Sequence, residues 1–230
     1  MTSPFTKLFA IMIAAFGVTS LFAAVPVAVW EGDFKTASKN NVTFDANGNT
    51  VAEDENGATV TIAETSNGGV KFAFDSSKTT GYLTAIVRYA NYTQPSANAV
   101  AISSTGGVAG NSGKDLFGAA VLSENGYLKN IWDNNVDNRG TMANVGLPGS
   151  GLLAMTFAGQ GANATKGAVV YVKANDATAL TQATSGLNVL YTTTVNLHGL
   201  AVGGNSGSTS LGKLTGLEIS AVAIFDSVLS

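Results

Sequence analysis

The chain has 230 residues, 27 of them glycine, and contains no cysteine, so neither disulfides nor thiolate chemistry is expected. Its net charge of -3 provides no positive field for a phosphate backbone, which excludes nucleic acid as an expected partner. Only 12% of the residues are charged, so Asn, Thr and Ser must cover much of the surface, as is typical of extracellular β-proteins.

Residues 1–24 predict a signal peptide. Lys7 precedes the apolar stretch LFAIMIAAFGVTSLFAA, which lacks acidic residues and ends in the small residues Ala23 and Ala24. We therefore expect cleavage near Ala24, with an uncleaved anchor as the alternative. Residues 25–230 would then form one mature domain, secreted or in the envelope of a bacterium, with no membrane span after cleavage.

Short segments rich in β-branched and aromatic residues predict strands throughout the first half. The Asn-Gly pairs at 47–48, 56–57 and 67–68 separate four of these segments and favour type I′ turns, so we expect a meander. Trp30 ends the first mature strand, and we expect it in the core beside the C-terminal strand. The expected strands are residues 25–34, 42–44, 50–53, 58–64 and 70–74.

The second half continues with longer strands, and no window has helical periodicity. A Gly/Ser-rich loop spans residues 104–114, and a polar connection spans residues 133–148. An Asn-Gly pair at 125–126 indicates a hairpin between its flanking strands. The expected strands are residues 82–90, 99–103, 116–122, 127–132, 152–158, 166–174, 198–204 and 217–225, which together predict an all-β domain.

The last strand alternates strictly, with Ile219, Ala221, Ala223 and Phe225 expected on one face. Because the other face also turns apolar, this strand should lie inside a sheet that is covered on both sides. Its sequence, I-S-A-V-A-I-F-D-S-V-L-S, resembles the closing strand of laminin-G-like, concanavalin A-type domains, which often reads I-D-E-V-x-I-Y-x-R-A-L-S. It departs from that pattern at Ser220, among other positions.

Two further segments fit the resemblance, which covers roughly residues 152–230. Val170-Tyr171-Val172 stands in place of the family's "lYvdG"-like strand, and residues 200–204, LAVGG, stand in place of its "iIGg"-like strand. The resemblance implies a two-sheet antiparallel jelly-roll sandwich of the concanavalin A-like type.

The sequence does not indicate a catalytic centre. A glycosidase needs two carboxylates, which endoglucanases of the resembled group carry on one strand as E-x-D-x-x-E, and this run is missing. Glu31 and Asp33 have the right alternation, but their neighbours indicate a strand that enters a turn. His198 begins a strand with no Ser or acidic partner marked by local sequence. We therefore expect a non-enzymatic domain, with a glycoside hydrolase as the third-ranked alternative.

Asp133, Asn135 and Asp137 have D-x-N-x-D spacing, which suits Ca²⁺, a cation that prefers carboxylate and carbonyl oxygens. The EF-hand signature is incomplete, because Asn138 replaces the glycine at position six and Asn144 replaces the glutamate at position twelve. The alternative is that these side chains only stabilise turns through local hydrogen bonds.

Tyr127, Trp132, Asn134 and Asn135 suggest a glycan site. An aromatic ring can stack on the apolar face of a sugar while amide groups bind its hydroxyls; the alternative places Trp132 in the core. We expect an exported, non-enzymatic sandwich that binds carbohydrate or another cell-surface ligand through residues 104–114 and 126–137. The alternative is a structural or adhesive envelope protein that self-associates through a sheet edge.

Overall fold

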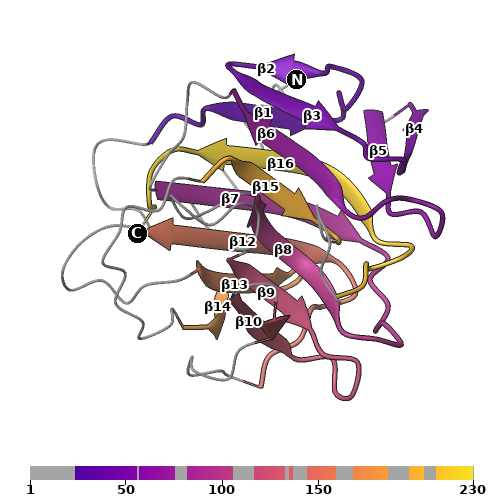
Figure 1. Ribbon diagram of the computed structural model, residues 1–230, viewed down its shortest axis with the longest axis vertical. Helices are drawn as coiled ribbons and strands as arrows, with labels where there is room; N and C mark the ends of the chain where they lie inside the picture. The colour runs from indigo at the N-terminus through magenta and orange to yellow at the C-terminus, as the bar shows by residue number, and fades with distance from the viewer. Residues whose placement is uncertain are drawn as a thin grey trace.

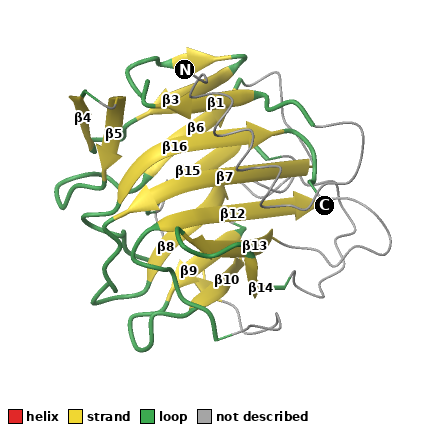
Figure 2. Ribbon diagram, turned by 180° about the vertical axis from the view of Figure 1, so that it is seen from behind, coloured by secondary structure: helices red, strands yellow, loops and turns green. Residues whose placement is uncertain are grey.

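The computed structural model describes residues 24–55, 57–75, 82–105, 117–132, 135–136, 144–158, 168–185, 197–204 and 211–229. These residues form strands and loops without a helix (Figure 2). The expected fold class is confirmed: two antiparallel sheets pack as a jelly-roll-like β-sandwich (Figure 1).

The first sheet, sheet A, has eight strands in the order β14-β13-β12-β7-β16-β5-β4, with β1 also paired to β16. Its strands are β1 (Ala28–Glu31), β4 (Thr50–Asp54), β5 (Gly57–Thr61), β7 (Tyr82–Ala90), β12 (Gly151–Ala158), β13 (Ala168–Ala174), β14 (Thr181–Thr184) and β16 (Glu218–Phe225).

The second sheet, sheet B, also has eight strands, in the order β11-β10-β9-β8-β15-β6-β3-β2. Its strands are β2 (Ser38–Lys39), β3 (Val42–Asp45), β6 (Val70–Phe74), β8 (Ala99–Thr105), β9 (Gly118–Val121), β10 (Leu128–Trp132), β11 (Asn135–Val136) and β15 (Gly199–Val202).

The closing strand β16 is interior, as predicted, because it pairs with β7, β5 and β1. The predicted facing of its side chains is wrong at one point. A bulge between Ile219 and Ala221 inserts an extra residue, so Ile219 faces the core while Ala221 lies on the outer face of sheet A. Val222 and Ile224 face inward, which reverses the expected alternation after the bulge.

The N-terminal strand lies beside the C-terminal one, as predicted, with Trp30 opposite Val222. The indole of Trp30 is fully buried, and its ring centroid lies 5.0 Å from that of Phe72 and 6.2 Å from that of Phe44. Phe44 also packs against Phe34, at 5.4 Å. This aromatic cluster joins β1 of sheet A to β3 and β6 of sheet B, and it anchors one side of the core.

The predicted meander is wrong, because two of its three turns connect the sheets. Asn47 and Gly48 do adopt the positive φ values of 54° and 80° that the Asn-Gly pair favours. However, β3 pairs in sheet B and β4 pairs in sheet A, so this turn crosses between the layers. Only β4 and β5 form the expected hairpin, since the segment from β5 to β6 crosses back to sheet B.

In the second half, the hairpin predicted at residues 125–126 is confirmed, and the predicted strands 152–158 and 166–174 also pair with each other. β9 and β10 pair on either side of Gly126, whose φ is 73°, and β12 pairs with β13 over seven residue pairs from Gly151↔Ala174 to Phe157↔Ala168. β7, β12 and β16 run side by side through the middle of sheet A (Figure 1). The loops that leave their ends carry the candidate site.

Candidate functional site

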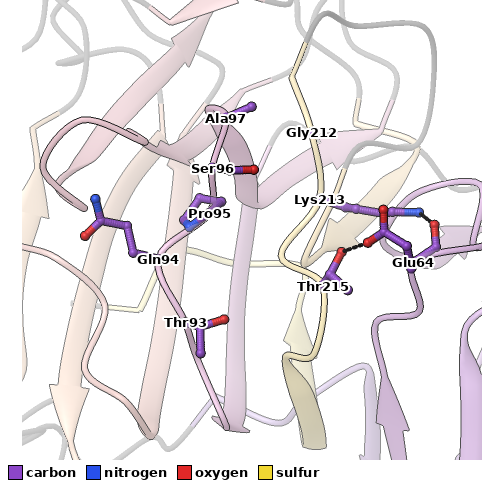
Figure 3. Close-up of a pocket in the computed structure, with 9 residues that line it drawn as sticks. All are labelled: Glu64, Thr93, Gln94, Pro95, Ser96, Ala97, Gly212, Lys213 and Thr215. Atoms are coloured by element: carbon purple, nitrogen blue, oxygen red, sulfur yellow. Dashed lines mark hydrogen bonds between the residues drawn. The ribbon is translucent and has the colours of Figure 1, made fainter.

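An open pocket of about 490 Å³ lies at the end of the sandwich where β7 ends and β16 begins. It runs between residues 93–97 on one side and residues 212–215 with Glu64 on the other (Figure 3). Its lining consists of Glu64, Thr93, Gln94, Pro95, Ser96, Ala97, Gly212, Lys213 and Thr215. Polar side chains dominate this lining, so the pocket suits a hydroxyl-rich ligand.

The loop after β7 is fixed by hydrogen bonds to two neighbouring segments. The Tyr92 backbone N–H donates to the Gly149 carbonyl over 3.0 Å, and the Gln94 amide donates to the Ser123 carbonyl over 2.7 Å. The Asn98 side chain accepts from the Ser123 N–H at 2.9 Å. These bonds hold the first wall of the pocket without using its hydroxyl groups.

The second wall is fixed by Lys213. Its ammonium donates to the carbonyls of Glu64 and Ser66, the latter at 2.9 Å, and so joins the loop before β16 to the loop before β6. The Leu214 N–H donates to the Gly203 carbonyl over 2.8 Å, which fixes the same segment to the end of β15. Lys213 thus has a structural role at the pocket wall, with its charge balanced by carbonyl dipoles.

Three polar groups remain available to a ligand. Thr215 donates to Glu64 Oε2 over 2.9 Å, which orients the carboxylate, and no described residue donates to Oε1. Thr93 and Ser96 are exposed, and within the described ranges their hydroxyls have no hydrogen-bond partner. Figure 3 shows both hydroxyls turned toward residues 212–215, whereas Gln94 points away. One carboxylate and two hydroxyls therefore line the open space.

Two tyrosines lie next to the first wall of the pocket, Tyr89 in β7 and Tyr92 in the loop that follows it. Tyr89 is 2% exposed and its hydroxyl donates to the Pro148 carbonyl over 3.0 Å. Burial raises the pKa of Tyr89 well above its ordinary value, and the neighbouring Tyr92 raises it further. Burial also raises the pKa of Tyr92, whose buried hydroxyl has no partner among the described residues.

The pKa of Tyr89 leads to a prediction for alkaline solution. Above pH ~10 the unfolded chain ionises this phenol while the folded chain keeps it neutral, so the free energy of unfolding should fall with rising pH. Tyr89→Phe should reduce that slope by up to about 1.4 kcal/mol per pH unit, at a cost of about 1 kcal/mol at neutral pH for the lost hydrogen bond. Urea denaturation from pH 8 to pH 11 measures both quantities, and equal slopes for the two proteins would contradict the assignment.

Of the residues predicted to bind a glycan, only Tyr127 has a side chain among the described residues. Tyr127 is half-buried, forms an isolated bridge with Gly146, and does not line the pocket. The register of β10 and β11 places Trp132 opposite Asn135, which brings two of the predicted residues together. The side chains of Trp132 and Asn135 lie outside the described residues, as do Asn134 and the calcium candidates Asp133 and Asp137, so the calcium site stays a prediction.

The carboxylates weighed for catalysis have other partners. Asp33 accepts from the Glu31 backbone N–H at 2.9 Å and pairs with Lys39, as expected for a residue that closes a turn. Glu31 lies 3.7 Å from Arg88 on the outer face of sheet A. His198 is exposed and precedes β15, with backbone hydrogen bonds to Thr105 and Phe74.

The pocket residues were not identified from the sequence. They come from three turns separated by about 30 and more than 100 positions, and none belongs to a motif with fixed spacing. The only local signal is that polar residues follow a core strand at Thr93 and Ser96.

Comparison with known proteins identifies the fold only. No family model and no curated protein matches the chain. Among solved structures, it resembles a Trypanosoma rangeli sialidase in complex with the inhibitor DANA, with a TM-score of 0.55 and 13% identity over 98% of this chain and 35% of that one. It also resembles a PL-14 alginate lyase from Aplysia kurodai, with a TM-score of 0.53 and 9% identity over 88% and 99% of the two chains. The chain spans 28–35% of the length of the first sialidase chains that it matches.

These likenesses correct one expectation. The prediction that the domain is not an enzyme is wrong as an exclusion, because the structures that share its fold include a sialidase and an alginate lyase. The missing E-x-D-x-x-E run rules out only one placement of catalytic groups, whereas a sandwich can position such groups on loops that are distant in sequence. No helix among the described residues is both long and apolar enough to cross a membrane.

Proposed function

We propose that this chain is an exported carbohydrate-binding β-sandwich of the laminin-G-like type, and that its end pocket holds a sugar unit by neighbouring hydroxyl groups. The free oxygens of the pocket carry this proposal. The Glu64 carboxylate accepts two hydroxyl protons of a vicinal diol, while Thr93 and Ser96 exchange hydrogen bonds with the next hydroxyl or the ring oxygen. Pro95 and Ala97 offer apolar surface to the C–H face of the sugar.

The rest of the proposal draws on the sequence and the comparisons. The leader at residues 1–24 supports export to a bacterial envelope or medium, where polysaccharides are accessible. The structural neighbours are enzymes named for sialic acid and alginate, which supports a carbohydrate ligand and makes bond cleavage an activity to assay. Ca²⁺ at Asp133, Asn135 and Asp137 stays a separate prediction, and the proposal for the pocket does not use it.

The test is a glycan microarray followed by titration calorimetry with the best neutral oligosaccharide. Thr93→Val and Ser96→Ala each remove one hydroxyl with little change in shape, so each should weaken binding by about 2- to 10-fold. Thr50→Val removes an exposed hydroxyl from β4, outside the pocket, and should leave the affinity unchanged. Unchanged binding in the Thr93→Val/Ser96→Ala double variant would refute the site.

The same samples can be assayed for cleavage. Incubation with the bound polysaccharide, followed by detection of new reducing ends or unsaturated products, measures hydrolysis and elimination. Turnover that is lost in Glu64→Gln while binding persists would add a catalytic role to the pocket. Turnover that persists in Glu64→Gln would place the chemistry outside it.

A further inference from the structure

The outer face of sheet A carries a straight row of residues that crosses five strands. The strand registers align Lys173 of β13 with Leu152 of β12, Leu152 with Arg88 of β7, Arg88 with Ala221 of β16, and Ala221 with Glu31 of β1. We call this the charged row. Four of these strands, β13, β12, β7 and β16, lie side by side in that order (Figure 2).

The next row toward the other end of the sheet is entirely apolar apart from one phenol. It contains, in register, Tyr171, Ala154, Ile86, Ala223 and Val29. Ala154 and Ile86 are buried, whereas Tyr171 is half-buried at the edge of the strip. Ala223 is buried as well, so the charged row runs beside an apolar row that is largely covered, and the partly exposed groups of the strip are Arg88, Lys173 and Tyr171.

Among the described residues, Arg88 has one long ion pair and Lys173 has none. The Arg88 guanidinium lies 3.7 Å from Glu31 Oε1, which is too long for a hydrogen bond, and its side chain is 32% exposed. Within the described part of the chain it makes no hydrogen bond, and the ammonium of Lys173 has no partner. A planar fork of N–H donors that is only loosely paired can accept a carboxylate with two hydrogen bonds.

The spacing of these groups fits a chain of acidic sugars. Arg88 and Lys173 are two strands apart, so their Cα atoms are separated by about 10 Å across the sheet. Tyr171 lies on the same face as Lys173 and two residues along β13, or about 7 Å away. Leu152, between the cations, is only 5% exposed, which agrees with long basic side chains whose stems cover an apolar neighbour.

We propose that this strip of Arg88, Lys173 and Tyr171 is a second binding site, separate from the end pocket, for a polysaccharide that carries carboxylates. Two carboxylates of the glycan pair with Arg88 and Lys173, and the C–H face of a ring stacks on Tyr171. A neutral glycan has no carboxylate to pair with Arg88 and Lys173. A partner with a flat apolar surface would leave both cations unpaired. The proposal does not depend on the end pocket, because no residue of the strip lines it.

The test is titration calorimetry of the whole chain with a short oligogalacturonate and with its methyl ester, which keeps the sugar backbone but removes the charge. The free acid should bind, the ester should bind at least tenfold more weakly, and Arg88→Gln and Lys173→Gln should each weaken binding of the acid by roughly tenfold. Lys71→Gln is the matched control, because it removes a half-buried lysine from β6 of sheet B. Thermal melting of each variant verifies that it is folded. If Arg88→Gln does not fold, Lys173→Gln alone tests the site.

Several outcomes would overturn the strip. They are no binding of the acid by the unmodified chain, equal binding of acid and ester, equal affinity of both variants and the unmodified chain, or binding to anionic phospholipid vesicles without binding to the oligomer. The two sites are distinguished by testing the variants of each site with the ligand of the other site. Thr93→Val/Ser96→Ala should leave binding of the acid unchanged, and Lys173→Gln should leave binding of the neutral oligosaccharide unchanged.

Discussion

Replacing Trp30 with alanine should lower the free energy of unfolding by about 3–5 kcal/mol. The indole is fully buried between the sheets, contacts the rings of Phe44 and Phe72, and donates from Nε1 to the Thr36 carbonyl over 2.9 Å. Its removal leaves a cavity among rigid aromatic neighbours that cannot collapse to fill it. Urea denaturation followed by circular dichroism measures the loss.

Trp30→Phe is the matched control for this substitution. It keeps a ring in the aromatic cluster and removes mainly the hydrogen bond to Thr36, so we expect a loss of about 1–2 kcal/mol. Equal losses for the alanine and phenylalanine variants would show that the ring contributes little packing, and would contradict the account of this part of the core.

Replacing Gly203 with alanine should cost about 2–5 kcal/mol, the sum of backbone strain and overpacking. Gly203 has a φ of 74°, which disfavours any residue with a Cβ. An added Cβ would also lie 2.8 Å from Cγ1 of Ile62, which is buried in the core and cannot move aside. The substitution therefore combines two penalties at one position.

Gly216 separates those penalties. Its φ is 85°, but no atom lies within 4 Å of where a Cβ would be, so Gly216→Ala should cost only the strain of about 1–2 kcal/mol. Chemical denaturation of both variants gives the difference. A loss for Gly203→Ala no larger than that for Gly216→Ala would contradict the close packing against Ile62.

Several elements could be predicted because their signals are local. An Asn-Gly pair favours positive φ at adjacent positions, and the prediction is correct at Asn47 and Gly48, whereas at 67–68 and 125–126 only the glycine has a positive φ. Residues 82–90 were predicted as a strand from their β-branched and aromatic residues, and residues 83–87 of this strand, β7, are buried on both faces. Gly203 also has a local cause, because the chain takes a positive φ of 74° where β15 ends.

Other features depend on contacts between distant residues and therefore could not be predicted. Whether the turn at Asn47 joins two strands of one sheet or crosses between the sheets depends on which neighbours β3 and β4 find, namely β6 and β5. The bulge beside Ile219 depends on the register with β7, because strict alternation in the sequence is compatible with either pairing.

The candidate site was missed for the same reason. Glu64, Thr93 and Thr215 become neighbours only when the loops after β5, β7 and β15 meet at one end of the sandwich. Each is an ordinary polar turn residue in its own segment. The residues that the sequence did favour, Tyr127 and Trp132, combine aromatic and polar groups within one short segment, which is the kind of pattern that local reading detects.

The end pocket is tested most directly by a crystal structure of the chain with the neutral oligosaccharide that binds best on the microarray. We expect a sugar ring between residues 93–97 and 212–215, with two adjacent hydroxyls within hydrogen-bond distance of the Glu64 carboxylate. A sugar bound instead at the Trp132 segment, with the end pocket unchanged, would contradict it.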